Sequence, residues 1–304
     1  MKSTVKKENK LIKFLNSKKV VPYIFVLPFI LSFSVLTLYP AIQAVVMSFQ
    51  RILPGQVEFI GLANYRRLMN PVFYRAFRNT LLYTFFTLLV LIPVPMILAV
   101  FLNSKIVKFK TILRSALFIP SLTSVVVAGL IFRLIFAESG ASIANQFIGL
   151  FGIDPIVWTT QSWSAIFLMV LLASWRWMGV NVLYFLAGLQ SIPDEMYESA
   201  DIDGANVFDK FRHITVPFLK SVTIFVTTIS IIGGFRVFAE SYVFWGASSP
   251  GNIATTLVSY LYQQGIQRND MGFGAAVGVV VLIIIFLVSL IYLILTGAFK
   301  KETR

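Results

Sequence analysis

Long apolar runs separated by short polar segments dominate this chain of 304 residues. Four of the runs contain no charged residue, and two more are interrupted only by Arg176 and by the pair Arg236 and Glu240. About 20 apolar residues allow a helix to cross the hydrocarbon core of a bilayer. The pattern predicts an all-α polytopic membrane protein with six transmembrane helices, at about 20–50, 79–104, 115–135, 164–189, 221–245 and 271–299.

The distribution of basic residues orients these predicted helices. Residues 1–19 contain seven lysines, and most other basic residues fall on the same side of the membrane if this tail is cytoplasmic. This bias and the even number of spans predict that both tails, 1–19 and 300–304, are cytoplasmic. Five arginines at 51–78 conflict with this orientation, because an outer loop should be poor in arginine. We expect residues 63–80 to lie as a short amphipathic segment at the interface, where arginine side chains reach water.

The composition supports a membrane protein and excludes several kinds of site. Hydrophobic residues make up 57% of the chain and charged residues 13%, whereas soluble domains carry about 25% charge. The net charge of +13 would suggest nucleic acid in a soluble protein, but here the basic residues flank apolar runs, so we expect no nucleic-acid partner. The absence of cysteine excludes disulfides and thiolate metal sites. Because no GxxxxGK[ST] loop occurs, we expect no nucleotide hydrolysis by this chain itself.

The polar segment 190–220 lies between the fourth and fifth predicted helices, on the cytoplasmic side. Its pattern predicts a helix–turn–helix along the membrane, because Ser191 with Asp194 fits a capping box and Asp203-Gly204 is typical of a turn. Apolar positions then repeat at helical spacing from Phe208 onward. From the charge pattern alone, a solvated connection between two spans is an equally good interpretation.

The same segment resembles the EAA loop of ABC importer permeases. That family has E-A-A, three residues, G, nine residues, I, one residue and L-P. This chain keeps the spacing with Glu198-Ser199-Ala200, Gly204, Ile214 and Val216-Pro217, departing only at Ser199 and Val216. In the family this loop docks into a groove on a separate cytoplasmic ATPase. The resemblance implies that ATPase coupling depends on Glu198, Ser199, Ala200, Asp203, Gly204, Phe208, Phe211, Ile214 and Pro217.

Other segments extend the resemblance over nearly the whole chain. Residues 59–68, 117–136 and 270–286 are similar to segments of the type I, maltose-permease-like carbohydrate importers, whereas 238–252 lacks the family's double glycine. Within the family, SWRWMGVNVLYFLAGLQ, SIIGGFR and SYLYQQG most resemble permeases of arabino-oligosaccharide importers of Gram-positive bacteria. The resemblance implies the type I permease fold, with one transmembrane domain over 20–299 in a bacterial cell membrane.

Polar residues inside the predicted spans are candidates for a substrate pathway. A charged side chain within the bilayer is costly and therefore marks a functional site by default. Aromatic rings beside amide and guanidinium donors suit a sugar, and Trp177, Asn181 and Tyr184 share one helix face. Arg236 and Glu240 are four residues apart and can pair on one face. The predicted pathway residues are Arg176, Trp177, Asn181, Tyr184, Arg236, Glu240 and Tyr242.

Purely structural roles stay open for these residues. Arg176 can pair with a carboxylate on a neighbouring helix for assembly alone, and the tryptophans can pack between helices. A paired Arg236 and Glu240 can likewise persist in a span as structure. The chain's single histidine, His213, has no cysteine or second histidine to join, so we expect no metal site.

The resemblance also implies the partners. They are a second homologous permease, two ATP-binding cassette subunits, an extracellular solute-binding protein, a sugar or oligosaccharide, and the lipid bilayer. No cofactor is then expected on this chain, since ATP and Mg²⁺ belong to the ATPase subunits, and the chain alone is not an enzyme. Two rival functions remain. One is a secondary transporter or channel that acts alone, with Glu240 as its only clear span carboxylate. The other is a membrane transferase in which Asp201 and Asp203 bind a divalent metal.

Overall fold

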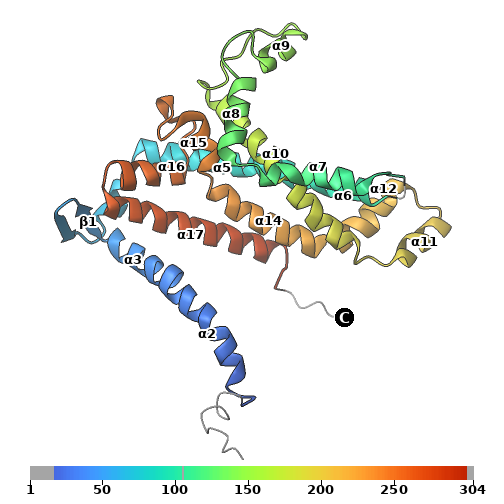
Figure 1. Cartoon of the computed structure of the whole chain (residues 1–304), viewed down its shortest axis with the longest axis horizontal. Helices are drawn as coiled ribbons and strands as arrows, with labels where there is room; N and C mark the ends of the chain where they lie inside the picture. Colours follow the sequence, from blue (N-terminus) through green and yellow to red (C-terminus); the bar gives the residue numbers. More distant parts are fainter. Residues whose placement is uncertain (1–16, 105, 300–304) are drawn as a thin grey trace, which may run out of the picture.

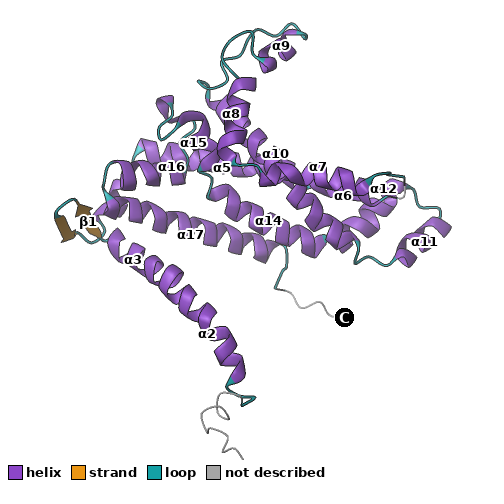
Figure 2. Cartoon of the chain, viewed as in Figure 1, coloured by secondary structure: helices purple, strands orange, loops and turns teal. Residues whose placement is uncertain are grey.

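The computed structural model describes residues 17–104 and 106–299. The predicted tails, over 1–16 and 300–304, lie outside these residues. Within the described part, helices form nearly all of the regular structure, and one short β-hairpin is the exception (Figures 1 and 2). Five helical stretches are long and apolar enough to span a membrane, or six if one strongly bent pair counts as a single span.

The helices follow the predicted apolar runs, but several runs are broken into two. The first run contains α2 (Val21–Phe33), a π-helical turn and α3 (Tyr39–Ser48). Helix α3 packs against α17, whereas α2 diverges from the body of the molecule (Figure 1). The fourth and sixth runs form the unbroken helices α10 (Ser162–Leu189) and α17 (Met271–Leu295). The broken runs are α5 (Pro71–Leu91) with α6 (Pro93–Asn103), α7 (Lys110–Leu122) with α8 (Val125–Ile135), and α14 (Lys220–Phe235) with α15 (Ala239–Trp245).

The third predicted span, 115–135, is not one straight helix. The axes of α7 and α8 differ by 97°. Pro120 removes one backbone donor from the last turn of α7, and Thr123 and Ser124 adopt extended backbone conformations. Helix α8 then packs on α15, where Gly129 lies directly against the side chain of Val243. The prediction failed because the contact that holds α8 comes from a segment more than 100 residues away.

The second helix begins eight residues earlier than predicted, at Pro71. The Asn70 side chain caps it, because Oδ1 accepts hydrogen bonds from the backbone N–H groups of Val72 and Phe73, at 3.1 and 3.0 Å. The predicted amphipathic segment over 63–80 is therefore not a single element. Its first part is the short helix α4 (Ala63–Arg67), and the rest forms the first turns of α5.

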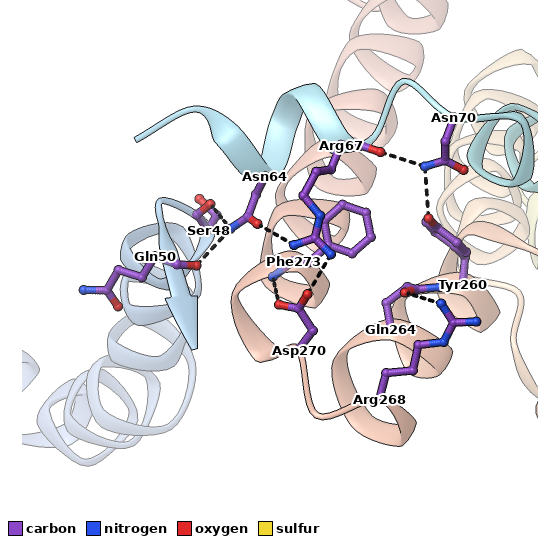
Figure 3. A network of polar contacts seen from close by, with 10 residues as sticks. All are labelled: Ser48, Gln50, Asn64, Arg67, Asn70, Tyr260, Gln264, Arg268, Asp270 and Phe273. Atoms are coloured by element: carbon purple, nitrogen blue, oxygen red, sulfur yellow. Dashed lines mark hydrogen bonds and ion pairs between the residues drawn. The ribbon is translucent and has the colours of Figure 1, made fainter. Parts of the chain in front are cut away.

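A polar network contains Arg67, one of the five arginines that conflict with the charge rule (Figure 3). Arg67 lies 2.8 Å from the carboxylate of Asp270, and its guanidinium stacks over the Phe273 ring at 4.3 Å. The buried Asn64 side chain donates to the carbonyls of Ser48 and Gln50, at 3.0 and 2.9 Å. The network joins α3, the hairpin β1 (Gln50–Leu53) and β2 (Gln56–Phe59), α4 and the start of α17.

The remaining elements lie at the two ends of the helical body. The helix–turn–helix of residues 194–218 occupies the end opposite the hairpin, and α9 (Ile143–Gly149) projects beyond α8 (Figure 1). The segment between α15 and α17 folds back onto α5, where the buried Asn79 amide donates to three backbone carbonyls, those of Asn252, Ile253 and Thr255. Short helices complete that segment: η3 (Pro250–Asn252), α16 (Leu257–Leu261) and η4 (Tyr262–Gln267).

Helix α10 is the centre of the fold and packs against α5, α6 and α7. Its backbone approaches α7 most closely at Gly179, where an added Cβ atom would lie 2.0 Å from the carbonyl oxygen of Leu117. Backbone atoms cannot move aside as a side chain can, so this crossing requires glycine.

We predict that Gly179→Ala forces α7 and α10 apart and lowers stability by about 1–3 kcal/mol, the usual cost of overpacking. Gly149→Ala is the matched control, because a Cβ atom there meets nothing within 4 Å. The midpoint of thermal unfolding in detergent measures both. Equal midpoints for the two variants would contradict the close backbone crossing.

Candidate translocation and coupling sites

A cavity of about 410 Å³ lies between α5, α10 and the broken helix α14–α15. Six of the seven predicted pathway residues line it: Arg176, Trp177, Asn181, Tyr184, Arg236 and Glu240. Tyr242 does not. Its ring instead packs against the rings of Phe238 and Tyr262, at centroid distances of 5.2 and 5.8 Å. The structure thus brings together side chains that lie more than 60 residues apart in the sequence.

An ion pair joins the two helices that face each other across this cavity. Nη1 of Arg176 lies 3.5 Å from Oε1 of Glu240, and the two side chains are only 14% and 10% exposed. The guanidinium also lies 5.6 Å from the centre of the Trp177 ring. Nε of Arg176 is buried without a hydrogen-bond partner among the described residues. The Glu240 carboxylate is therefore the main group that balances the positive charge of Arg176.

The predicted pair between Arg236 and Glu240 is wrong. Helix α14 ends at Phe235 and the chain resumes a helix only at Ala239, so the two residues do not share a helix face. The i,i+4 rule needs a continuous helix. Arg236 is exposed, whereas Glu240 is buried and faces Arg176 on α10. The assembly role left open for Arg176 is therefore the one that the geometry supports within this chain.

Asn181 supports the broken second span. Its Nδ2 donates to the backbone carbonyl of Leu91 at 2.8 Å. In a continuous helix that carbonyl would accept from residue 95, but Pro95 has no N–H group to donate. The amide on α10 thus satisfies a carbonyl that the prolines of α6 leave free.

We predict that Asn181→Ala lowers stability by about 1–3 kcal/mol, because it leaves the Leu91 carbonyl buried without a partner. Tyr184→Phe is the control, since it keeps the ring that packs edge-on against Phe225 at 5.4 Å. Thermal unfolding of the two purified variants is the measurement. If Asn181→Ala unfolds at the parent's temperature, the Leu91 carbonyl has another donor.

Sequence reasoning missed the contribution of α5 to this cavity. Tyr83 and Thr87 line it from that helix, and Thr84 packs against Gly234 of α14. A signal was present, because the polar positions Asn79, Thr80, Tyr83, Thr84 and Thr87 recur at helical spacing inside an apolar run. All five are buried, so they mark the face of α5 that meets the rest of the protein.

The segment 190–220 forms the predicted helix–turn–helix. Helix α11 (Asp194–Ile202) is followed by Asp203 and by Gly204, whose φ of +76° places it in the left-handed region. The N–H of Ala205 donates back to the carbonyl of Ala200 at 2.9 Å, as in a glycine C-cap. Lys210, in α12 (Val207–Lys210), closes the turn through an ion pair of 2.6 Å with Asp201.

The capping box lies on the second helix, not the first. Oγ of Ser191 donates to the carbonyl of Gly188, and α11 has no side-chain cap, so the Ser191–Asp194 prediction is wrong. Asn206 and Asp209 instead cap α12 reciprocally. A π-helical turn, Phe211–Thr215, and α13 (Val216–Phe218) then lead into α14.

The nine predicted coupling residues divide between two faces of this loop. Ile214 is buried, and Ala200 and Phe211 are half-buried against the chain's own core. Phe211 therefore faces inward, toward the core of this chain. The exposed members are Glu198, Ser199, Asp203, Gly204, Phe208 and Pro217.

Two exposed apolar side chains beside the turn were missed. Ile202 is 88% exposed and Val207 is 78% exposed, and with Phe208, at 66%, they form an apolar tip around Gly204. The sequence places Ile202 and Val207 next to the turn, and this position was the available signal. A contiguous group of exposed apolar side chains is a candidate interaction surface.

Comparisons with known proteins place this architecture. Residues 67–304 match the family described as "Binding-protein-dependent transport system inner membrane component". The chain belongs to this family. As an inner membrane component, it is an integral membrane protein, in agreement with its apolar helices.

Relatives of this inner membrane component match it over almost their full length. It is 64% identical over 286 residues to the arabinooligosaccharides transport system permease protein of Bacillus subtilis, covering 94% of this chain and 91% of the relative. It is 60% identical over 296 residues to the protein of the same name from Halalkalibacterium halodurans, covering 97% of this chain and 94% of the relative. A crystal structure of a bacterial ABC transporter that imports the polysaccharide alginate contains the same fold, with a TM-score of 0.81 at 22% identity, covering 96% of this chain and all of that one.

Proposed function

We propose that this chain is a permease subunit of an ATP-driven importer of arabino-oligosaccharides. The observation that carries the proposal is the 64% identity to an arabinooligosaccharide permease over nearly the whole of both chains. A match of that extent includes the residues of the cavity and of the helix–turn–helix. The chain supplies one half of a translocation path in this proposal, and it hydrolyses no nucleotide itself.

The cavity between α10 and α14–α15 is the proposed sugar pathway. The rings of Trp177 and Tyr184 offer faces for sugar rings, and Arg236 offers donors to hydroxyl groups. The buried pair of Arg176 and Glu240 spans the cavity and fixes its width. Because the chain is not helical at residues 236–238, α15, which carries Glu240, can move relative to α14 without breaking a continuous helix.

The helix–turn–helix is the proposed coupling element. The apolar tip of Ile202, Val207 and Phe208 enters a groove on a cytoplasmic ATPase subunit, and the exposed Glu198 contacts the rim of that groove. Ala200, Phe211 and Ile214 serve a different role, because they fix the loop to the core of this chain. The loop then moves as one rigid body with the transmembrane helices when the ATPase subunits close.

The assembly follows from this arrangement. Six crossings with cytoplasmic termini put the loop of residues 190–220 on the ATPase side and the hairpin on the outer side. A second permease, two ATPase subunits that hold ATP and Mg²⁺, and an extracellular binding protein complete the importer. A structural relative supports the extracellular binding protein as a partner, since that alginate transporter was crystallised with a pentasaccharide-bound periplasmic protein.

Competition for uptake tests the proposed substrate. Cells that lack their own importer would express this chain with its genomic neighbours and take up labelled arabinotriose. We expect excess unlabelled arabino-oligosaccharides to abolish uptake and maltotriose to leave it unchanged. Equal competition by maltotriose would reject the arabino-oligosaccharide assignment while leaving the importer function intact.

We predict that Trp177→Ala raises the KM of uptake about fivefold, because it removes one ring face worth about 1 kcal/mol. Trp175→Ala is the matched control. Trp175 lies two residues away on α10 and packs against Phe132 at 5.7 Å, outside the cavity. The same rise in KM for both variants would remove Trp177 from the pathway.

A further inference from the structure

A second, larger cavity opens on the surface of the transmembrane region between α5 and α10. Its volume is about 610 Å³, and it is lined almost entirely by apolar side chains. Leu82, Phe86 and Leu89 form one wall and Phe167 and Val170 the other. The exposed rings of Phe86 and Phe167 show that the groove is open to the surroundings of the protein. It is separate from the cavity that contains Arg176 and Glu240.

The charged group that lines this groove lies at one end, and the hydroxyl group of Ser174 lies near the other. The charged group is that of Arg78 on α5, and Ser162 and Trp163, the first two residues of α10, lie at the same end. Among the residues that the structure describes, no carboxylate lies within the 4.0 Å limit of an ion pair with Arg78. Two of the other arginines at 51–78 do form ion pairs, Arg51 with Glu58 and Arg67 with Asp270. Arg78 thus offers an uncompensated positive charge at the mouth of an apolar groove.

The length of the groove matches one leaflet of a bilayer. From Arg78 to Val90, the helical rise of 1.5 Å per residue gives about 18 Å. Ser162 to Ser174 on α10 covers the same length. One leaflet of a hydrocarbon core of about 30 Å is about 15 Å thick, which is close to the length of the groove. When the groove runs parallel to the lipid acyl chains, Arg78 therefore lies at the level of the headgroups. Tryptophan is also typical of that level, and Trp163 is exposed there.

We propose that this groove is a phospholipid-binding site. The phosphate group pairs with the guanidinium of Arg78, and one acyl chain fills the groove between α5 and α10. Charge, apolar lining and length favour this ligand over a sugar, which would need polar groups along the groove. The length of the groove fits an acyl chain in either leaflet. The proposed lipid site also does not depend on which substrate is transported.

Lipid titration of the intact purified importer, followed by native mass spectrometry, tests the proposal. We expect phosphatidylglycerol to bind saturably, and Arg78→Gln to weaken it about fivefold, as expected for one basic residue at a membrane surface. Arg66→Gln is the matched control, because Arg66 is also exposed at this end but does not line the groove. Diacylglycerol lacks the phosphate, and glycerophosphoglycerol lacks the acyl chains. Both should bind more weakly than phosphatidylglycerol to the parent.

Two results would overturn the proposal. One is equal binding of phosphatidylglycerol to the parent, Arg78→Gln and Arg66→Gln, which would mean unspecific lipid. The other comes from a photo-crosslinking amino acid in place of Phe86, whose side chain is exposed in the groove. Crosslinks to phospholipid support the site, whereas crosslinks only to the second permease would show that a protein helix fills the groove.

Discussion

Glu240→Gln is expected to lower the stability of the protein by about 3–5 kcal/mol and to abolish transport. The substitution keeps the shape of the side chain but leaves Arg176 buried and charged, without its carboxylate partner at 3.5 Å. Removing one member of a buried ion pair costs far more than the pair itself contributes, because the remaining charge is uncompensated. Thermal unfolding in detergent and sugar uptake are the two readouts.

Two further variants make this prediction specific. The double variant Arg176→Gln with Glu240→Gln removes both charges and should recover most of the lost stability. Arg236→Gln should leave stability unchanged, since Arg236 is exposed and is not the partner of Glu240. If Arg236→Gln destabilises the protein as much as Glu240→Gln does, the ion pair has been assigned to the wrong arginine.

Gly204→Trp is expected to reduce co-purification of the ATPase subunit more than tenfold and to stop transport, while the chain remains folded. A Cβ atom at this position meets nothing within 4 Å in the chain, so the indole projects outward from the turn. It would stand beside the exposed tip of Ile202 and Val207 and hold the partner surface away. Mass spectrometry of the tagged, purified complex gives the ATPase ratio.

The control must separate steric blocking from backbone strain. A non-glycine residue at φ of +76° costs about 1–2 kcal/mol wherever it occurs. Gly152 has φ of +73° and open space around its Cβ position, and it follows α9, which projects away from the helix–turn–helix (Figure 1). Gly152→Trp should therefore retain the ATPase. Full retention by Gly204→Trp as well would show that the turn is not a docking surface.

The sequence predicts the helices well where local pattern decides them. The apolar runs at 164–189 and 271–299 predicted α10 and α17, and the Asp203-Gly204 signal predicted the turn of the helix–turn–helix. Breaks within the runs were not predicted, because distant contacts stabilise them. The bend before Val125 depends on α15, and the free carbonyl of Leu91 depends on Asn181 of α10.

The candidate sites show the same division. Helical spacing correctly placed Trp177, Asn181 and Tyr184 on one face, and the structure adds that this face lines a cavity. Local spacing failed for Glu240, whose partner lies 64 residues away and not four. The sequence also does not show that Phe211 packs against the core, because hydrophobicity alone does not tell which face of a short helix meets the core.

Reconstitution in proteoliposomes tests the central claim most directly. The purified chain, its second permease and the ATPase subunits would be reconstituted, and arabinotriose uptake measured with the extracellular binding protein. We predict uptake that requires both ATP and the binding protein and is unaffected when ion gradients are dissipated. Uptake by this chain alone, driven by a proton or sodium gradient, would contradict the account and identify a secondary transporter.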